Sequence, residues 1–119
     1  MQTFDLLVVG GGSGGLATAQ RAVEYGARVA LFEPAELGGT CVNVGCVPKK
    51  VMWNAAQIAH AAHDATHYGF DLTLNGHDWD LLRERRDAYV ERLNGIYARN
   101  LANKKIVVFR GFARFCGPN

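Results

Sequence analysis

The sequence predicts an α/β fold built on a parallel sheet. Three observations predict it: a short apolar run leads into a glycine-rich turn, an alanine-rich helical stretch follows the turn, and a second apolar run follows that stretch. All three fall within about 30 residues, as a βαβ unit requires. Two longer helical patterns and a third apolar run come later. We therefore expect a Rossmann-like βαβ unit with additional helices.

Composition limits the classes of protein to consider. The chain has 119 residues, 49% of them hydrophobic and 20% charged, which is typical of one globular domain. A net charge of +2 gives no reason to expect nucleic acid or a membrane surface as a partner. No apolar run approaches the roughly 20 residues of a membrane span. Three cysteines, and no basic segment before the first apolar run, favour a cytoplasmic location.

The first strand and its turn carry a nucleotide-binding pattern. Phe4–Val9 is a nearly continuous apolar run, which predicts a strand buried on both faces. It leads directly into G-x-G-x-x-G at Gly10, Gly12 and Gly15. Gly10 allows the tight turn, Gly12 lets a pyrophosphate approach the backbone, and Gly15 lets the following helix pack closely. A glycine turn without a ligand is the alternative, and the complete βαβ context disfavours it.

The second strand ends on an acid. Leu16–Tyr25 is expected to be helical, with Gly26 ending the helix, and Arg28–Glu33 reads as a strand. Glu33 lies 23 residues after Gly10, where a carboxylate can bind ribose hydroxyls. That carboxylate would repel a 2′-phosphate. The expected ligand is therefore FAD or NAD.

Two cysteines form the second candidate site. Cys41 and Cys46 are five residues apart, and Asn43 and Gly45 between them favour a tight turn. Pro48 precedes an alanine-rich pattern, so Cys46 is expected at a helix N-terminus, where N–H groups and the dipole stabilise a thiolate.

The pair is best explained as a redox-active dithiol. A structural disulfide is rare in an intracellular protein, and a zinc site would need more ligands than the single remaining Cys116. Lys49 and Lys50 add positive charge nearby. Cys41 follows Glu33 by only eight residues, so one loop, containing Gly38–Thr40, leads from the adenosine end to the dithiol. Flavin is the cofactor that naturally exchanges two electrons with a dithiol.

These motifs resemble those of the flavin disulfide oxidoreductases. The likeness rests on G-G-G-S-G-G at Gly10–Gly15 and on G-G-T-C-V-N-V-G-C-V-P-K-K at Gly38–Lys50. The continuation V-M-W-N at Val51–Asn54 is most similar to the branch of the family that reduces glutathione disulfide. Two other branches, the dihydrolipoamide dehydrogenases and the mercuric reductases, usually have Ser where Lys49 stands.

The resemblance implies roles for individual residues. Cys41 would be the interchange thiol that meets glutathione disulfide, and hence the more exposed of the pair. Cys46 would lie nearer the flavin, with Lys49 beside the reactive ring nitrogen. Gln20 stands where some members have an arginine for a glutathione carboxylate. The residues expected to bind FAD are Gly10, Gly12, Ser13, Gly14, Gly15, Glu33, Gly39, Thr40, Cys41, Lys49 and Ala113; those expected to contact glutathione are Ser13 and Tyr97.

The resemblance also implies what residues 1–119 represent. Members of the family are several times longer and have an NADPH-binding domain and an interface domain, so this chain is expected to be the first part of an FAD-binding domain, inactive alone. The complete enzyme would be a homodimer that uses NADPH as co-substrate. Two alternatives stay open: a stand-alone flavin and dithiol carrier, and a fragment of a related flavin disulfide reductase.

The remaining elements follow from periodicity. Pro48–His67 is expected to be a helix, and Asp78 is expected to cap a second helix that reaches about Leu101. Ile106–Arg110 reads as a third parallel strand. On the first helix, one face of small and apolar residues is expected to be buried, and a histidine face is expected to be solvated rather than metal-binding. The buried face comprises Val51, Ala55, Ile58, Ala62 and Ala65; the histidine face comprises His60, His63 and His67.

Overall fold

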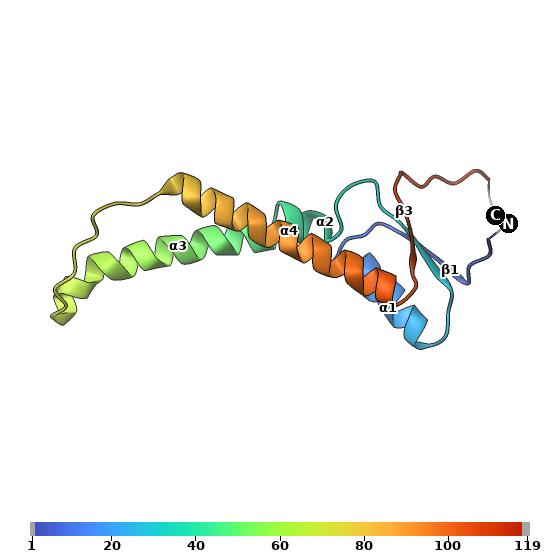
Figure 1. Cartoon of the computed structure of the whole chain (residues 1–119), viewed down its shortest axis with the longest axis horizontal. Helices are drawn as coiled ribbons and strands as arrows, with labels where there is room; N and C mark the ends of the chain where they lie inside the picture. The colour runs from blue at the N-terminus through green and yellow to red at the C-terminus, as the bar shows by residue number, and fades with distance from the viewer. Residues whose placement is uncertain (1, 118–119) are drawn as a thin grey trace.

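The computed structural model describes residues 2–117, which form an elongated molecule of 69 × 27 × 22 Å. A small α/β lobe holds both termini of the described chain at one end, and a hairpin of two long helices projects from it (Figure 1). The α/β class with a parallel sheet is the one that the sequence predicts.

The sheet has three strands in the order β1–β2–β3. They are β1 (Leu6–Val9), β2 (Val29–Phe32) and β3 (Val107–Phe109), and both neighbouring pairs are parallel. Leu31 is opposite Val8 on one side and Val108 on the other. The expected third parallel strand is confirmed, and each strand is shorter than its apolar run.

One face of the sheet carries the core. Helix α1 (Ser13–Glu24) packs against it and contributes Leu16 and Ala19, which are almost wholly buried. The last residues of the longest helix reach the same core. The buried cluster comprises Val8, Leu16, Ala19, Val29, Leu31, Leu37, Leu101 and Ile106.

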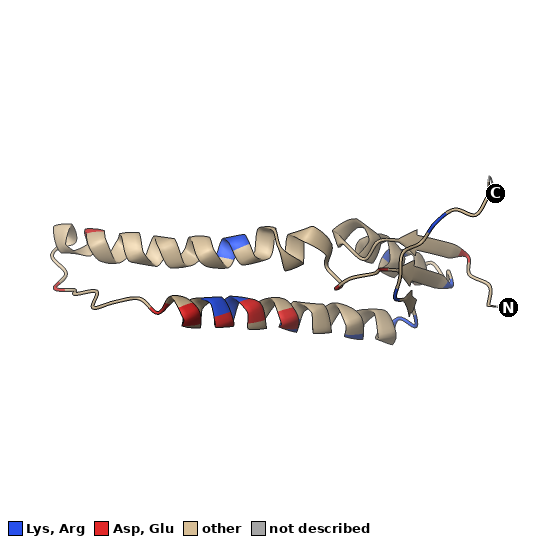
Figure 2. Cartoon of the chain, turned by 90° about the horizontal axis from the view of Figure 1, so that it is seen from above, with Lys and Arg blue, Asp and Glu red and all other residues tan. Residues whose placement is uncertain are grey.

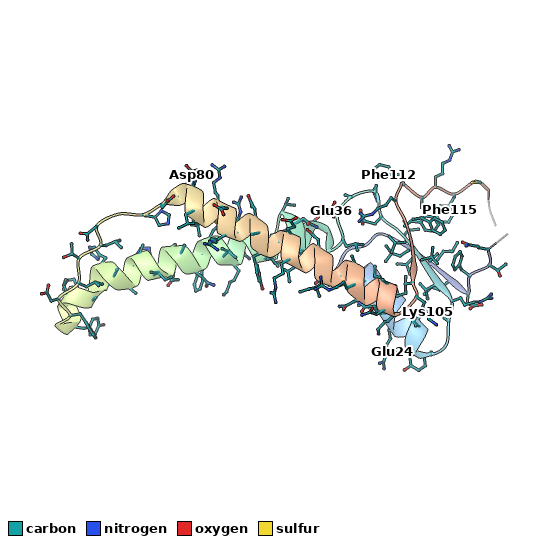
Figure 3. The ribbon with its side chains drawn as sticks, in the orientation of Figure 1. Glu24, Glu36, Asp80, Lys105, Phe112 and Phe115 are labelled. Carbon is teal, nitrogen blue, oxygen red and sulfur yellow. The ribbon has the colours of Figure 1, made fainter. Side chains whose placement is uncertain are left out.

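The other face of the sheet is open, which corrects the expectation that the first strand is buried on both faces. Leu7 is 58% exposed and Val9 69% exposed, because α1 covers only the opposite side. Together with Phe32 and the segment after β3, these side chains line a hollow of about 570 Å³. Figure 3 shows Phe112 and Phe115 on that segment, beside the strands.

Two long helices form the hairpin. Helix α3 (Cys46–Asp64) continues into a 3₁₀ turn (Ala65–Tyr68), and α4 (Trp79–Asn103) returns along it to the sheet (Figure 1). Asp78 is the N-cap of α4 as expected, since its Oδ1 accepts a hydrogen bond of 2.9 Å from the Leu81 N–H.

The face of α3 that was expected to be buried is only half-buried, at Val51, Ala55 and Ala62. No residue of α3 is buried, and Ile58 is 69% exposed. Apolar periodicity marks a face that can be buried, whereas actual burial needs a neighbour, and α4 lies along only one side of α3. Acidic and basic residues alternate along the first half of α4, whereas α3 carries few charges (Figure 2). Within residues 2–117, none of the helices combines the length and apolar character needed to cross a bilayer.

A short helix was not expected. α2 (Gly39–Asn43) occupies the segment read from sequence as a loop, so Thr40 and Cys41 lie on a helix. The boundary of α1 also differs: it begins at Ser13 rather than Leu16, because Gly12 is its N-cap. Ser13, Gly14 and Gly15 therefore form the first turn of α1.

Candidate functional site

The first glycine turn is shaped by backbone packing. Gly10 has φ of +100°, and its N–H donates to the Phe32 carbonyl at 2.8 Å, which fixes the turn at the end of β1. A Cβ on Gly15 would collide with the Gly10 carbonyl oxygen and lie 3.2 Å from a Val8 methyl. Gly15 is therefore required for α1 to pack against the strand, as the sequence pattern predicts.

A second glycine pair lies directly against this turn. The Gly38 N–H donates to the Gly11 carbonyl at 2.8 Å, and Gly12 and Gly38 form a parallel bridge. A Cβ on Gly39 would lie 2.8 Å from the Gly12 Cα. The two loops, Gly10–Gly15 and Gly38–Gly39, thus touch through their backbones and leave no room for side chains where they meet.

We call the two glycine loops, Gly10–Gly15 and Gly38–Gly39, the glycine cradle. The outer surface of the cradle is open. A Cβ on Gly12 would have Gly39 Cα as its nearest neighbour at 3.8 Å, and one on Gly14 would meet nothing within 4 Å. Ser13, the first residue of α1, is exposed beside them. Bare backbone next to a helix N-terminus is the arrangement that accepts phosphate groups, so the residues present fit a dinucleotide such as FAD.

Glu33 joins the glycine turn to the loop after β2. The side chain is only 9% exposed. Its Oε2 accepts from the Gly11 N–H at 2.6 Å and its Oε1 from the Ala35 N–H at 2.9 Å. A carboxylate has about four acceptor positions, so two remain for ribose hydroxyls. Glu33 thus holds the turn in place in addition to its expected role with ribose.

The two cysteines lie on consecutive helices. Cys41 is on α2, and Cys46 is the first residue of α3, the helix N-terminus that the sequence predicts. A Cβ on Gly45 would lie 2.7 Å from the Thr40 carbonyl oxygen and 3.1 Å from the Cys41 Cα. The absence of a side chain at Gly45 therefore lets the start of α3 approach α2 at the dithiol.

Both thiols are free, and they interact. A hydrogen bond between the two side chains is the largest cause that raises the pKa of Cys41 above that of an ordinary thiol. Partial desolvation and the charge of Cys46 also raise the pKa of Cys41, and the Lys49 charge opposes the rise. Lys49 is thus close enough to act on Cys41 electrostatically.

The exposure of the two thiols is the reverse of what we expected. Cys46 is exposed, whereas Cys41 is half-buried. The physical reason lies in the helices that carry them, since α2 contacts both α3 and α4 and approaches Gly12 through Gly39, while α3 has no buried residue.

Three other expected site residues lie on α4, on the segment after β3 and on α1. Tyr97 is half-buried on α4 and packs against the core cluster. Ala113 lines the hollow on the open sheet face, together with Leu7 and Val9 of the strand that leads into Gly10. Gln20 uses its side chain within α1, where its Nε2 donates to the Leu16 carbonyl at 3.1 Å.

The histidines contribute no cluster. His60, His63 and His67 are all exposed on the α3 segment. Among residues 2–117, no three His, Cys, Asp or Glu side chains gather as a metal site would require.

Comparison with known proteins assigns the family. Residues 4–119 match the family model described as pyridine nucleotide-disulphide oxidoreductase. The chain belongs to this family.

Relatives in the family are glutathione reductases. The glutathione reductase of Debaryomyces hansenii is 50% identical over an alignment covering 100% of this chain and 26% of that protein. The glutathione reductase of Schizosaccharomyces pombe is 50% identical over an alignment covering 98% of this chain and 26% of that protein. The glutathione reductase of Yarrowia lipolytica is 54% identical over an alignment covering 92% of this chain and 24% of that protein. The chain thus spans about a quarter of the length of these relatives.

Sequence reasoning missed an amide pair at this family's dithiol segment. Asn43 was noted only as a turn residue, and Asn94 was not singled out. The structure joins them, with Asn94 Nδ2 2.9 Å from Asn43 Oδ1. A signal was present, because Asn94 lies three residues before Tyr97 and seven before Leu101, on the apolar side of its helix. A polar residue at such a position needs a partner.

Proposed function

We propose that this chain is the FAD-binding and redox-dithiol part of a glutathione reductase, in which electrons pass from NADPH through FAD and the Cys41–Cys46 pair to glutathione disulfide. The observation that carries the proposal is the approach of Cys41 to Cys46 across Gly45, on a segment continuous with the glycine cradle. The relatives named glutathione reductase support the substrate.

The proposed cofactor site combines the two glycine loops with the acid at the end of β2. Gly12, Ser13 and Gly14 would contact the pyrophosphate, and Glu33 would bind the ribose. Gly39, Thr40 and Lys49 would follow the dinucleotide toward the dithiol. FAD, when bound, supplies two-electron transfer between NADPH and the disulfide. The expected contact of Ala113 is part of the same proposal.

The thiols would then perform two exchange steps. The Cys41 thiolate attacks one sulfur of glutathione disulfide, so the first glutathione leaves and a mixed disulfide forms. The Cys46 thiolate attacks the Cys41 sulfur, which releases the second glutathione and restores the Cys41–Cys46 disulfide. Each departing thiolate takes one proton. Ser13 and Tyr97 are proposed to contact the substrate.

Residues outside this chain complete the proposed enzyme. Residues 1–119 contain one G-x-G-x-x-G, which the FAD site uses. We propose that the NADPH-binding and interface domains belong to the rest of a longer protein, which acts as a cytoplasmic homodimer, and that residues 1–119 alone do not turn over. Flavin at one per purified chain, reduced through the dithiol, would instead favour a self-sufficient carrier.

The test traps the first exchange step. In a Cys46→Ser, Cys116→Ser chain, glutathione disulfide should add one glutathione to Cys41. With FAD bound, the matched Cys41→Ser, Cys116→Ser chain should react at Cys46 more slowly, because the flavin would cover Cys46. Intact mass and peptide mapping measure the rates. A lipoamide probe that reacts much faster than glutathione disulfide would point to a related reductase. A Cys41 that forms no mixed disulfide would contradict the proposal.

A further inference from the structure

Three segments of the chain meet at the Asn94 side chain. Its Nδ2 donates to the Leu37 carbonyl at 2.7 Å and to Asn43 Oδ1 at 2.9 Å. Asn43 in turn donates from its Nδ2 to the Gly39 carbonyl at 2.9 Å and to the Leu37 carbonyl at 3.3 Å. The entry to the glycine pair, the end of α2 and the middle of α4 are thus held by one small amide network, which we call the asparagine clamp (Asn43, Asn94 and the Leu37 carbonyl).

The clamp acts on the dithiol segment because of where Asn43 lies. Asn43 is two residues after Cys41 and three before Cys46. Asn94 is 51 residues away on α4, whose far end is anchored in the core through Leu101. The clamp therefore links the cysteine-bearing segment to a helix whose end is buried in the hydrophobic core.

The network is more than a surface contact. Leu37 is 2% exposed, so its carbonyl depends on protein donors. Asn94 and Asn43 are both half-buried. Removing the Asn94 amide takes the donor from Asn43 Oδ1 and leaves the Leu37 carbonyl only its longer bond from Asn43. Leaving a half-buried acceptor without its donor costs free energy, so the segment is expected to rearrange toward water.

We propose that Asn94 is a positioning residue for the dithiol, which acts through Asn43 to hold Cys41 and Cys46 in the geometry that closes into a disulfide. This inference rests on the proposed function of the pair. A disulfide forms only within a narrow range of Cα separations and Cβ directions. Holding two groups near that geometry raises their effective concentration, and a looser turn lowers it.

The measurable quantity is the exchange equilibrium with glutathione. One dithiol and one glutathione disulfide yield the Cys41–Cys46 disulfide and two glutathione thiols, so atoms and electrons balance. Loss of the clamp should disfavour the closed disulfide, and we expect Asn94→Leu to lower this equilibrium constant three- to tenfold. A tenfold change equals about 30 mV in the two-electron potential.

The experiment uses the chain with Cys116→Ser as the common background. Samples are equilibrated in glutathione buffers of varied ratio, quenched with acid and alkylated, and the oxidised fraction is measured by mass spectrometry. Asn100→Leu is the matched control, because Asn100 is an exposed asparagine on the same helix; its equilibrium constant should equal that of the background. Asn94→Asp keeps the shape of the side chain but has no N–H to donate, so it should shift the constant in the same direction as Asn94→Leu.

The outcomes separate this inference from the proposed function. A background chain that forms no Cys41–Cys46 disulfide in any buffer overturns both. A background chain that forms it, with Asn94 variants within twofold of it, overturns only the role of Asn94. If circular dichroism shows Asn94→Leu unfolded, Asn94→Asp and Asn94→Ser decide. In an Asn43→Ala chain, adding Asn94→Leu should have a smaller effect than in the background, since the Asn94–Asn43 bond is already gone and only the Asn94 bond to the Leu37 carbonyl is left to lose.

Discussion

Gly12 and Gly15 belong to one motif but should fail in different ways when each is replaced by alanine. Gly12 has φ of −78°, which any residue adopts, and its new Cβ would meet only Gly39 Cα at 3.8 Å. Gly15→Ala would place a methyl group against the Gly10 carbonyl, with the Gly10 carbon at 3.0 Å and a Val8 methyl at 3.2 Å. The first change is expected to spare the fold, and the second is not.

The magnitudes follow from those contacts. Forcing a methyl group into packed backbone costs roughly 1–3 kcal/mol. For a domain of this size that lowers the melting temperature by about 4 °C per kcal/mol. Gly12→Ala should leave the melting temperature unchanged or raise it slightly, because alanine restricts the unfolded chain. Its methyl group would occupy the proposed pyrophosphate position, so FAD affinity should fall at least about tenfold, or 1.4 kcal/mol.

Two assays decide the matter. Thermal unfolding followed by circular dichroism measures stability, and titration of flavin fluorescence measures FAD affinity. Gly76→Ala is the control, since its Cβ would meet nothing within 4 Å and the residue lies outside the motif. The reasoning is refuted by a Gly12→Ala chain that binds FAD as tightly as the parent chain, or by a Gly15→Ala chain that melts at the parent temperature.

Three further substitutions test other parts of the structure. Gly45→Ala should weaken closure of the disulfide, because its Cβ would lie 2.7 Å from the Thr40 carbonyl oxygen; an unchanged equilibrium with glutathione would contradict this. Hydrogen bonds from Arg28 lower the pKa of Asp5 to about 2, so the stability that this carboxylate contributes is present above about pH 4 and is lost as pH falls toward 2. Asp5→Asn should remove that part of the acid dependence of the melting temperature, and an identical acid profile would count against it. Asp78→Ala should cost about 1 kcal/mol by removing the cap of α4, measured by urea denaturation; no loss would mean that the cap is dispensable.

Local patterns predicted the parts of this fold that depend on neighbours in sequence. The strand before Gly10, the helix after it and the cap at Asp78 are each specified within a few residues, and they were found. Helix α2 was missed because five residues beginning at Gly39 show no helical period. The burial of α3 was overestimated for a different reason, since the pattern around Ile58 shows which face is apolar and not whether a partner covers it.

The candidate site likewise has features that a local sequence pattern predicts and features that depend on how distant segments pack. The two cysteines and the glycine motif were recognised because their spacing is itself the signal. The second role of Glu33, as acceptor for the Gly11 N–H, depends on how the turn folds back after β2. The link between Asn43 and Asn94 spans 51 residues and has no local signature. Exposure of the thiols was misjudged because it depends on the packing of α2.

Helix α4 connects the tip of the hairpin to the α/β lobe without a break. Its 25 residues, which include no proline, span about 37 Å at the usual rise per residue. One end is seated in the core at Leu101, the middle is tied at Asn94, and the other end begins at Trp79 near the tip of the hairpin. The tip of the hairpin, the cysteine-bearing segment and the core are thus all connected to one uninterrupted helix.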